Sequence, residues 1–323
     1  MELSRFDPES LARMRQALLS GEPIHLVARE IPAGLRIDEI APLLSSVRTE
    51  NTRLRAAFEA RLAPRGRPGP GPEVTVVIPS HRRTPLGLAG WVAQDVRPRV
   101  LVVSNGAQGP VQVPGAELLR LEWRGHGETR QEAVERVLTP YVLFTVDDAL
   151  PLGRGLLRTL VEELEKGDYE AVVARQIAWP DADHVTAERL RRWTPSGERA
   201  VDFPQADNVA TLYRTELLRR APFPDVPIAE DAWWSLGRRI GYVPFAPVLH
   251  SHERSPRELF RRNKAIHEQL VRMGRPPTVK GLGAVLGALP GAVRPVAKGG
   301  MRELGNQVGE LLGQWAGARA GRR

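Results

Sequence analysis

The spacing of apolar residues changes along this chain, and the change separates a helical beginning from a middle built of strands. Leu11, Met14 and Leu18 recur three to four positions apart, which predicts a helix. Val74–Ile78 is a short continuous apolar run followed by proline, a pattern typical of a buried strand. We therefore expect a helical N-terminal region over residues 1–63 and a different architecture after it.

A segment rich in proline and glycine lies between the two regions. Residues 64–72 contain four Pro and three Gly, a composition that favours an extended connection over a helix or strand. We interpret this segment as a linker and a domain boundary.

Beyond the linker, predicted strands alternate with predicted helices at short intervals. Further strands are expected at 100–103, 117–123, 141–146, 171–173 and 242–249, and helices at 128–138 and 155–166. This alternation predicts an α/β domain over residues 73–270 with a mostly parallel, doubly wound sheet. Ligands of such sheets bind outside the carboxyl ends of the strands, so the residues that directly follow strands are the candidates for function.

The composition narrows the class of protein. The 323 residues are 42% hydrophobic and 26% charged, as in ordinary globular proteins. Cysteine is absent, which excludes disulfides, zinc–thiolate sites and a thiol nucleophile. We find neither a signal peptide nor an apolar run long enough to span a membrane, and we expect a cytoplasmic protein.

Positive charge is concentrated in the last part of the chain. Residues 271–323 hold 9 basic and 2 acidic residues, a net +7, whereas residues 73–270 are nearly neutral. A nearly neutral central domain argues against a nucleic-acid enzyme. Because Leu286, Leu311 and Trp315 lie among these charges, we expect a basic amphipathic helical tail that docks on an anionic membrane surface at the inner face of the cell membrane. The alternative is that the tail packs on the α/β domain or on a second subunit.

Two adjacent carboxylates follow a predicted strand at Asp147 and Asp148. Such carboxylates repel each other unless positive charge lies beside them, and a divalent cation that also binds phosphate oxygens would supply it. The alternative is an ordinary solvated turn.

Two further pairs of polar residues are candidates for a functional site. His250 and His252 lie two residues apart after a strand, so both rings can face one metal ion or phosphate group. Glu230 and Asp231 open a predicted helix, where acidic residues are also favoured by the helix dipole without any function.

In their order along the chain, these motifs resemble the inverting glycosyltransferases of family 2, which have the GT-A nucleotide-diphospho-sugar transferase fold. The similarity covers residues 73–270. It rests on the strand Val76–Ser80 with the following His81-Arg82-Arg83, on Val102–Gly106, Glu128–Gln131, Tyr141–Ala149, Asn208–Arg214 and Ile228–Tyr242, and on Val248–His252 as in rhamnosyltransferase-like members.

This resemblance implies a metal-dependent enzyme that moves a hexosyl or deoxyhexosyl group from a nucleotide-diphosphate sugar to a glycan or lipid-linked acceptor, in the synthesis of cell-envelope polysaccharide or glycoconjugates. Asp231 would be the general base, and Asp148, His250 and His252 would hold Mn²⁺ or Mg²⁺. Glu230, Asn208 and Trp233 would orient the acceptor. The nucleotide sugar would contact Pro79, Ser80, His81, Arg82, Ser104, Asn105, Arg130 and Asp147.

Two departures from the family pattern leave alternatives open. Val146 stands at the first position of the usual three-residue acidic motif, and Ser104 with Asn105 replaces an expected acidic contact. A non-catalytic nucleotide-sugar-binding or scaffold protein of the same fold is therefore one alternative. A sugar-nucleotide pyrophosphorylase is another, although its glycine-rich loop after the first strand is missing. The Gly-x-Gly-x-x-Gly motif of a Rossmann dehydrogenase is also absent.

Overall fold

The computed structural model of this protein describes residues 71–81, 85–106, 113–179, 182, 184–252, 254–275 and 304–322. The expected helical region 1–63, nearly all of the expected linker 64–72 and the candidate nucleotide contact Arg82 lie outside the described residues. So do residues 276–303 of the expected basic tail.

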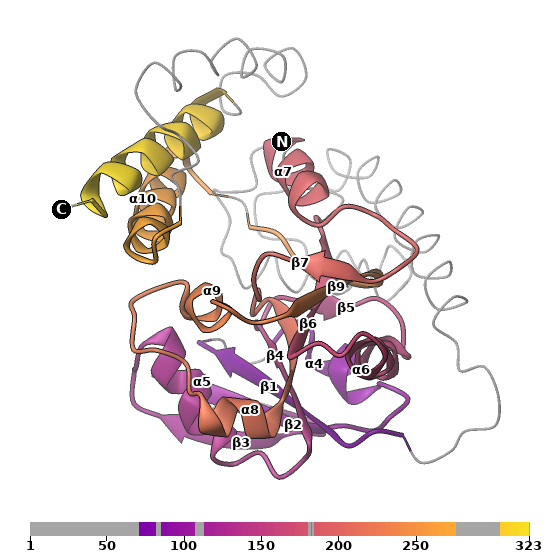
Figure 1. The fold of residues 1–323 in the computed structure, drawn as a ribbon. Helices are drawn as coiled ribbons and strands as arrows, with labels where there is room; N and C mark the ends of the chain where they lie inside the picture. The colour runs from indigo at the N-terminus through magenta and orange to yellow at the C-terminus, as the bar shows by residue number, and fades with distance from the viewer. Residues whose placement is uncertain are drawn as a thin grey trace, which may run out of the picture.

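The central part of the chain alternates strands and helices, as the sequence pattern predicts (Figure 1). In chain order the elements are β1 (Val74–Ser80), α4 (Leu88–Val92), β2 (Arg99–Asn105), β3 (Glu117–Leu121), α5 (His126–Val134), β4 (Tyr141–Thr145), β5 (Leu150–Pro151), α6 (Leu156–Lys166), β6 (Ala171–Ile177), α7 (His184–Trp193), β7 (Val201–Phe203), β8 (Ala210–Arg214), α8 (Thr215–Arg220), α9 (Glu230–Trp234), β9 (Ile240–Leu249) and α10 (Pro256–Arg272). A last helix covers residues 304–320.

All the strands of the described region belong to one nine-stranded sheet, in the order β3-β2-β1-β4-β8-β6-β9-β5, with β7 also pairing with β9. Most of these strands run in one direction, namely β1, β2, β3, β4, β6 and β9. The other direction is taken by β5, β7 and β8. The expected mostly parallel α/β sheet is confirmed, and the reversed strands are additions to it.

The strand directions decide which residues meet at one edge of the sheet. The parallel strands β1, β4, β6 and β9 all end there, so the residues that follow them come together. Strand β8 is antiparallel to both β4 and β6, and it therefore begins at this edge. The residues that precede β8 consequently lie beside residues that follow the other strands.

Helices cover both faces of the sheet and bury its apolar side chains. Trp91 of α4 and Leu160 of α6 pack with Val76 on one face, and Val134 of α5 packs with Val77 on the other. The neighbours Val76 and Val77 face opposite sides because side chains alternate along a strand. Burial of each aliphatic side chain stabilises the fold by about 1.5–3 kcal/mol. The packed faces of the sheet therefore hold the ends of the strands in fixed positions.

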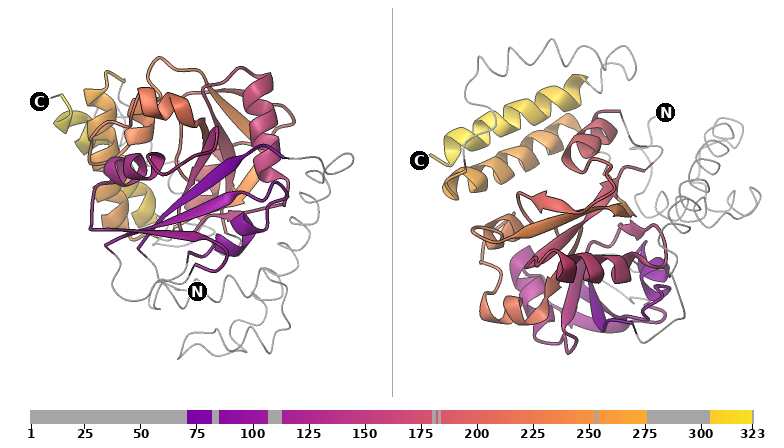
Figure 2. Two further views of the ribbon diagram at one scale, coloured as in Figure 1. Left: turned by 90° about the horizontal axis from the view of Figure 1, so that it is seen from below. Right: turned by 45° about the vertical axis from the view of Figure 1, so that its right-hand side comes forward.

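The helix over residues 304–320 lies along α10, as both Figure 1 and the right-hand view of Figure 2 show. Its glycines recur at every fourth position and therefore form one face of the helix. A methyl group on any of them would meet α10 closely; the contacted residues are Pro256 for Gly305 and Gly309, Phe260 for Gly313, Lys264 for Gly317, and Glu268 for Gly321. The two helices thus approach backbone to backbone.

This contact bears on the expectation for the C-terminal tail. Residues 304–322 pack on α10 of the α/β domain, in agreement with the alternative that the sequence left open. No helix within the described residues combines the length and the apolar character that crossing a membrane would require.

Candidate active site

Asp148, His250 and His252 meet at the carboxyl ends of β4 and β9. The Nε2 atom of His250 lies 3.6 Å from Oδ1 of Asp148, and Nδ1 of His252 lies 3.3 Å from Oδ2. The two Nε2 atoms of the histidines are 3.1 Å apart, and one ligand atom from each of the three residues falls within 4.8 Å of the others. The structure therefore brings together the three residues that the sequence analysis assigned to a metal.

The side chain of Gln176, at the end of β6, fixes the orientation of His250. Its Nε2 donates to Oδ2 of Asp207 at 2.6 Å, because a carboxylate only accepts. Its Oε1 consequently faces Nδ1 of His250, at 3.2 Å. Since an amide oxygen also only accepts, Nδ1 of His250 carries the ring proton, and the lone pair of Nε2 points toward Asp148 and His252.

Both histidines are suited to remain neutral. Burial lowers the pKa of His250, and burial together with the charge of Arg254 lowers the pKa of His252 to about 3, although Asp148 opposes both shifts. Neutral imidazoles are the form that binds metal ions. With one carboxylate, they form a compact set of three electron-donating groups.

A second group of side chains lies around the start of α9. Backbone N–H of Asn208, which precedes β8, donates to Oδ2 of Asp231 at 2.8 Å, and Nδ2 of Asn208 donates to Glu230 at 3.3 Å. The hydroxyl of the buried Tyr213 donates to Oδ1 of Asn208 at 2.8 Å. Ala229, just before the two carboxylates, adopts a left-handed conformation with φ of 66°, which turns the chain into α9. These contacts hold Glu230 and Asp231 in place.

Glu230 forms a buried ion pair with Arg130 of α5. Nη1 of Arg130 donates to Oε1 of Glu230 at 2.7 Å, and both side chains are only 6% exposed. Burial favours the neutral acid, but the charge of Arg130 and the hydrogen bonds of Glu230 outweigh it and lower the pKa of Glu230. The structure thus places Arg130, a predicted nucleotide contact, against a carboxylate on the acceptor side of the predicted site.

The surroundings of Asp231 shift its pKa in the opposite direction from that of Glu230. Burial, followed by the negative charges of Glu230 and Asp207, raises the pKa of Asp231 to about 7. A carboxyl group with such a pKa can accept and release a proton near neutral pH, which is the property required of a general base. The neighbouring Trp233 lies partly buried on α9, and its indole Nε1 has no hydrogen-bond partner among the residues described.

The other described residues predicted to contact the nucleotide lie at the ends of β1, β2 and β4. Ser80 donates to Oδ2 of Asp147 at 2.9 Å, next to Pro79, and Nδ1 of His81 donates to the carbonyl oxygen of Asn105 at 2.9 Å.

The side chain of Asn105 itself is held by the backbone that follows β3. Its Nδ2 donates to the carbonyl of Arg124 at 2.9 Å, and its Oδ1 accepts from the N–H of Arg124 at 2.8 Å. This pair of bonds ties two strand ends together. Ser104 is only 2% exposed.

Two residues of the polar network were missed or undervalued by sequence reasoning. Gln176 was not singled out, although its place at the end of a strand on the ligand-binding edge was a usable signal. Asp207 was not singled out either, because no sequence pattern indicates that β8 runs antiparallel to β4 and β6. Together they connect His250 to the loop that carries Asn208.

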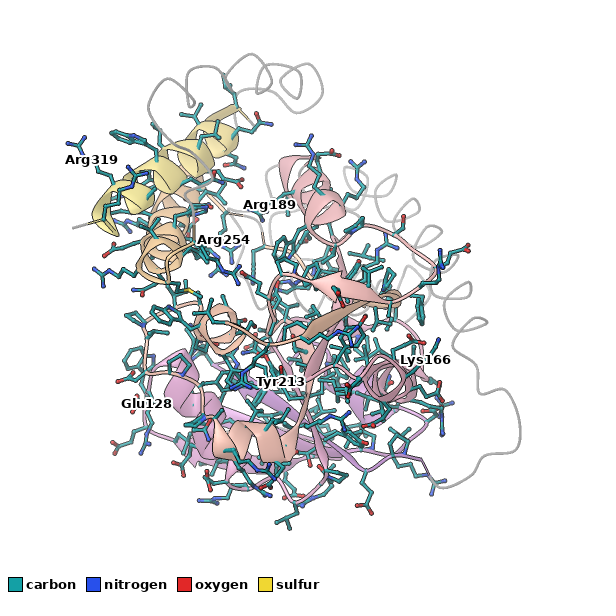
Figure 3. The ribbon with its side chains drawn as sticks, viewed as in Figure 1. Glu128, Lys166, Arg189, Tyr213, Arg254 and Arg319 are labelled. Atoms are coloured by element: carbon teal, nitrogen blue, oxygen red, sulfur yellow. The ribbon has the colours of Figure 1, made fainter. Side chains whose placement is uncertain are left out.

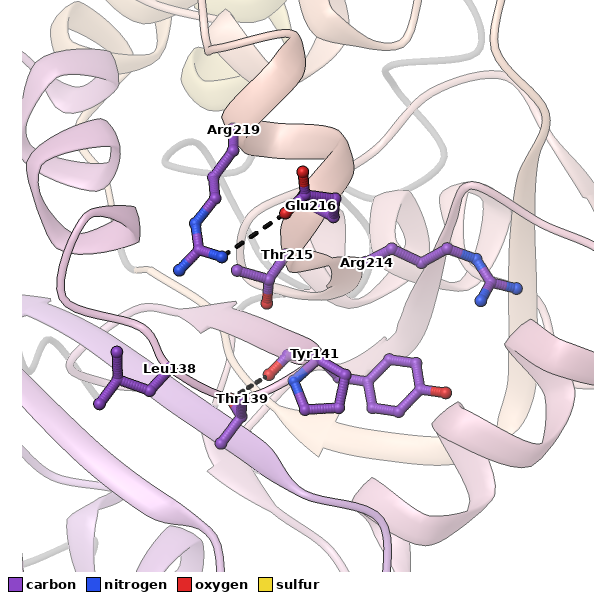
Figure 4. A pocket seen from close by; sticks show the side chains of 8 residues that line it. Leu138, Thr139, Tyr141, Arg214, Thr215, Glu216 and Arg219 are labelled. Atoms are coloured by element: carbon purple, nitrogen blue, oxygen red, sulfur yellow. Dashed lines mark hydrogen bonds and ion pairs between the residues drawn. The ribbon is translucent and has the colours of Figure 1, made fainter.

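A pocket of about 420 Å³ opens elsewhere, at the beginning of β4 (Figure 4). It lies between Thr139 and Tyr141 on one side and Arg214 and Glu216 on the other. Because Tyr141 is the first residue of β4 and Asp147 follows its last, the pocket is at the end of the strand opposite the candidate active site.

We compared the sequence and the structure with those of known proteins. No family model matches the sequence, and no curated protein matches it either. The structure is similar to the mannosyltransferase PcManGT from Pyrobaculum calidifontis in complex with GDP-Man and Mn²⁺, with a TM-score of 0.54 and 17% identity over 83% of this chain and 95% of that one. A weaker similarity, with a TM-score of 0.43 and 15% identity over 62% of this chain and 66% of that one, relates it to S. aureus TarS 1–349 in complex with UDP-GlcNAc.

The similarity to the mannosyltransferase structure defines the class of the fold. The chain has the mixed α/β architecture of GT-A-type glycosyltransferases, as expected from its sequence motifs. At this level of identity the similarity establishes the fold, and the function rests on the site.

Proposed function

We propose that this protein is a metal-dependent, inverting glycosyltransferase that uses a nucleotide-diphosphate sugar. The observation that carries the proposal is the convergence of Asp148, His250 and His252 at the same sheet edge as a partly buried carboxyl group, Asp231, whose pKa is raised to about 7. A metal-ligating set and a general base are the two components that direct sugar transfer requires. The fold shared with a mannosyltransferase whose structure contains GDP-Man and Mn²⁺ supports it.

The set of donor atoms fits a divalent transition metal. Carboxylate oxygen suits Mn²⁺ and Mg²⁺ alike, but imidazole nitrogen is a poor ligand for Mg²⁺. Two imidazoles beside one carboxylate therefore favour Mn²⁺. Bound there, the ion would neutralise the charge of the leaving nucleoside diphosphate.

The protein's own groups supply the remaining chemistry. Asp231 accepts the proton of the acceptor hydroxyl as the oxygen forms its bond to the anomeric carbon and the bond to the diphosphate breaks. Because the hydroxyl attacks directly, the anomeric configuration inverts. Glu230, kept ionised by Arg130, and Asn208 lie next to Asp231 and would orient the acceptor.

Asp148→Ala tests the metal assignment. The variant should lose the stabilisation that Mn²⁺ with GDP or UDP gives to the wild type in thermal unfolding, since the only carboxylate of the three-residue set is removed. Asp225→Ala, at an exposed acidic residue, is the matched control and should retain it. An undiminished Mn²⁺ effect in Asp148→Ala would refute the assignment.

Turnover of a nucleotide sugar distinguishes an enzyme from the alternative, a non-catalytic protein with this fold. A glycosyltransferase usually transfers some sugar to water, so slow hydrolysis of a nucleotide sugar with Mn²⁺ is expected here. A scaffold protein would bind the nucleotide without releasing sugar. The raised pKa of Asp231 favours the enzyme, because a binding site has no need for a carboxyl group that titrates near neutral pH.

Finer aspects of the function belong to the same proposal. Membership of family 2 and of its rhamnosyltransferase-like branch, transfer of a hexosyl or deoxyhexosyl group, and a role in making cell-envelope glycans are proposed on the motif resemblance. A glycan or lipid-linked acceptor is proposed on the same resemblance. A location on the inner face of the cell membrane is proposed on the basic, apolar C-terminal sequence, and association of two copies stays a prediction.

A further inference from the structure

The buried amide of Gln176, near the carboxyl end of β6, connects a carboxylate to one of the candidate metal ligands. Its Nε2 donates to Oδ2 of Asp207 at 2.6 Å, and its Oε1 lies 3.2 Å from Nδ1 of His250. The side chains of Gln176 and His250 are only 4% and 7% exposed, so these contacts are largely shielded from water.

Asp207 determines which way round this amide lies. Oδ2 of Asp207 also accepts from the indole N–H of Trp193 at 3.2 Å, and Oδ1 accepts from the backbone N–H of Val209 at 3.2 Å. Because a carboxylate only accepts hydrogen bonds, it holds the NH₂ group of Gln176 and leaves the amide oxygen facing His250. The proton of the neutral His250 ring is therefore on Nδ1.

The segment that carries Asp207 is itself anchored. The backbone N–H of Asp207 donates to Oγ1 of Thr211 at 3.1 Å, and this hydroxyl donates to the carbonyl oxygen of Asp207 at 2.5 Å. The next residue, Asn208, accepts at 2.8 Å from the hydroxyl of Tyr213, which lies in the interior of the domain below α9 (Figure 3). These bonds keep Asp207 facing Gln176.

The tautomer of His250 decides that of His252. The Nε2 atoms of the two rings are 3.1 Å apart, and a hydrogen bond between them requires one of them to donate. Because Nε2 of His250 has no proton, Nε2 of His252 donates, and Nδ1 of His252 keeps its lone pair. These two unprotonated nitrogens are the ones that approach Asp148: Nε2 of His250 lies 3.6 Å from its Oδ1, and Nδ1 of His252 lies 3.3 Å from its Oδ2.

We propose that Gln176 is a positioning residue that sets the tautomers of both histidines, so that Nε2 of His250 and Nδ1 of His252 bind the metal ion together with Asp148. This inference rests on the proposed function. Binding the ion exchanges the hydrogen bond between the two rings for a bond from His250 to the metal, without moving a proton. With the proton on Nε2 of His250, the same step would require the proton to leave first.

The first test is the tautomer of each ring in metal-free, ¹⁵N-labelled protein, from the nitrogen chemical shifts and the couplings to the ring protons. The wild type should have the proton on Nδ1 of His250 and on Nε2 of His252. Gln176→Met has a side chain of nearly the same length without the amide, and it should lose the preference at His250. A wild type with the proton on Nε2 of His250, or an unchanged preference in Gln176→Met, would overturn the proposal.

The second test is the affinity for Mn²⁺ alone, by titration calorimetry. Gln176→Met should weaken it about 10–100-fold, the usual effect of removing the partner that orients a ligating histidine. Gln94→Met is the matched control, because Gln94 is another buried glutamine whose amide is fully engaged. Its partners are the carbonyls of Gly90 and Gly153 and the N–H of Leu157, none of them a metal ligand, so Mn²⁺ affinity should be kept.

The outcomes separate this inference from the proposed function. If the wild type and Gln176→Met bind Mn²⁺ equally, or if Gln94→Met weakens binding as much, Gln176 is only a structural residue and the inference is wrong, although the metal site stands. If the wild type does not bind Mn²⁺ while His250 carries its proton on Nδ1, the proposed metal is wrong and the tautomer assignment stands. Should Gln176→Met fail to fold, the tautomers of the wild type still decide.

Discussion

At the scale of single residues, Asp231 has the environment that departs most from that of an ordinary carboxyl group. Its pKa of about 7 results from burial and from the neighbouring carboxylates Glu230 and Asp207. Its oxygens accept from the N–H groups of Asn208 and Ala232, both at 2.8 Å, so the group is also fixed in orientation. Because a raised pKa and a fixed orientation serve proton transfer, the role of Asp231 as a base can be tested separately from nucleotide binding.

Asp231→Asn should retain nucleotide binding and lose transfer by about 10²–10⁴-fold, the usual contribution of a general base. The measurement is sugar transfer or donor hydrolysis under saturating Mn²⁺ and donor. Asp225→Asn serves as the control for the same chemical change at an exposed position. Normal turnover in Asp231→Asn would reduce Asp231 to an acid at a helix start.

The pH dependence of the wild-type rate follows from the same pKa. A base works only in its unprotonated form, and Asp231 reaches that form as the pH rises through about 7. The rate should therefore climb between about pH 6 and pH 8 and level off above. A rate that is already constant from pH 5 upward would show that the base has an ordinary carboxyl pKa and is not Asp231.

The ion pair of Arg130 and Glu230 gives a prediction for stability. Because both side chains are buried, Arg130→Met leaves an uncompensated charge on Glu230 and should lower the free energy of unfolding by about 3–5 kcal/mol in urea titrations. The double variant Arg130→Met with Glu230→Leu should recover much of this loss. A single variant as stable as wild type would mean that the pair is not closed in solution.

At the scale of elements, the direction of β8 determines the composition of the site. Most strands of the parallel framework could be predicted from their apolar runs, and so could Asp148, His250 and His252, because each follows a strand. The reversal of β8 could not be predicted, since a run such as Ala210–Arg214 carries no sign of its direction. The role of Asp207, which directly precedes Asn208 and β8, could not be predicted for this reason, whereas Gln176 lies near the end of the predicted strand β6.

The C-terminal helix shows a second limit of sequence reasoning. The sequence analysis used its apolar residues Leu311 and Trp315 to predict a membrane-facing helix and did not use its glycines. The spacing of four between the glycines was the informative signal. It predicts a face without side chains, which only a close partner can cover, and α10 is that partner.

Gly313→Ala tests this contact. In an exposed helix the change would stabilise by about 1 kcal/mol, because alanine favours helix. Here the added methyl group would lie 2.5 Å from the carbonyl oxygen of Phe260, so we expect a loss of about 1–3 kcal/mol in the free energy of unfolding instead. Gln307→Ala, on the other face of the same helix, should be nearly neutral. A gain in stability from Gly313→Ala would rule out the close approach.

At the scale of the whole molecule, the basic C-terminal sequence is the feature that could locate the enzyme. Replacing Lys280, Arg294 and Lys298 with Gln should weaken co-sedimentation with anionic vesicles about a hundredfold, at about 1 kcal/mol for each basic residue near the surface. The same change at the exposed Arg191, Arg192 and Arg220 is the control for net charge. Equal binding of the two variants, or binding insensitive to salt, would exclude a membrane role for this segment.

The left-handed conformation of Ala229 has a consequence for how the protein reaches its native state. An alanine in this conformation is disfavoured by about 1–2 kcal/mol, so the isolated peptide would not adopt it. What holds it are partners distant in sequence: Arg130 lies 100 positions from Glu230, and Asn208 lies 23 from Asp231. The carboxyl groups of Glu230 and Asp231 therefore depend on contacts that are distant in sequence, and no fragment lacking α5 or the segment before β8 would reproduce their environment.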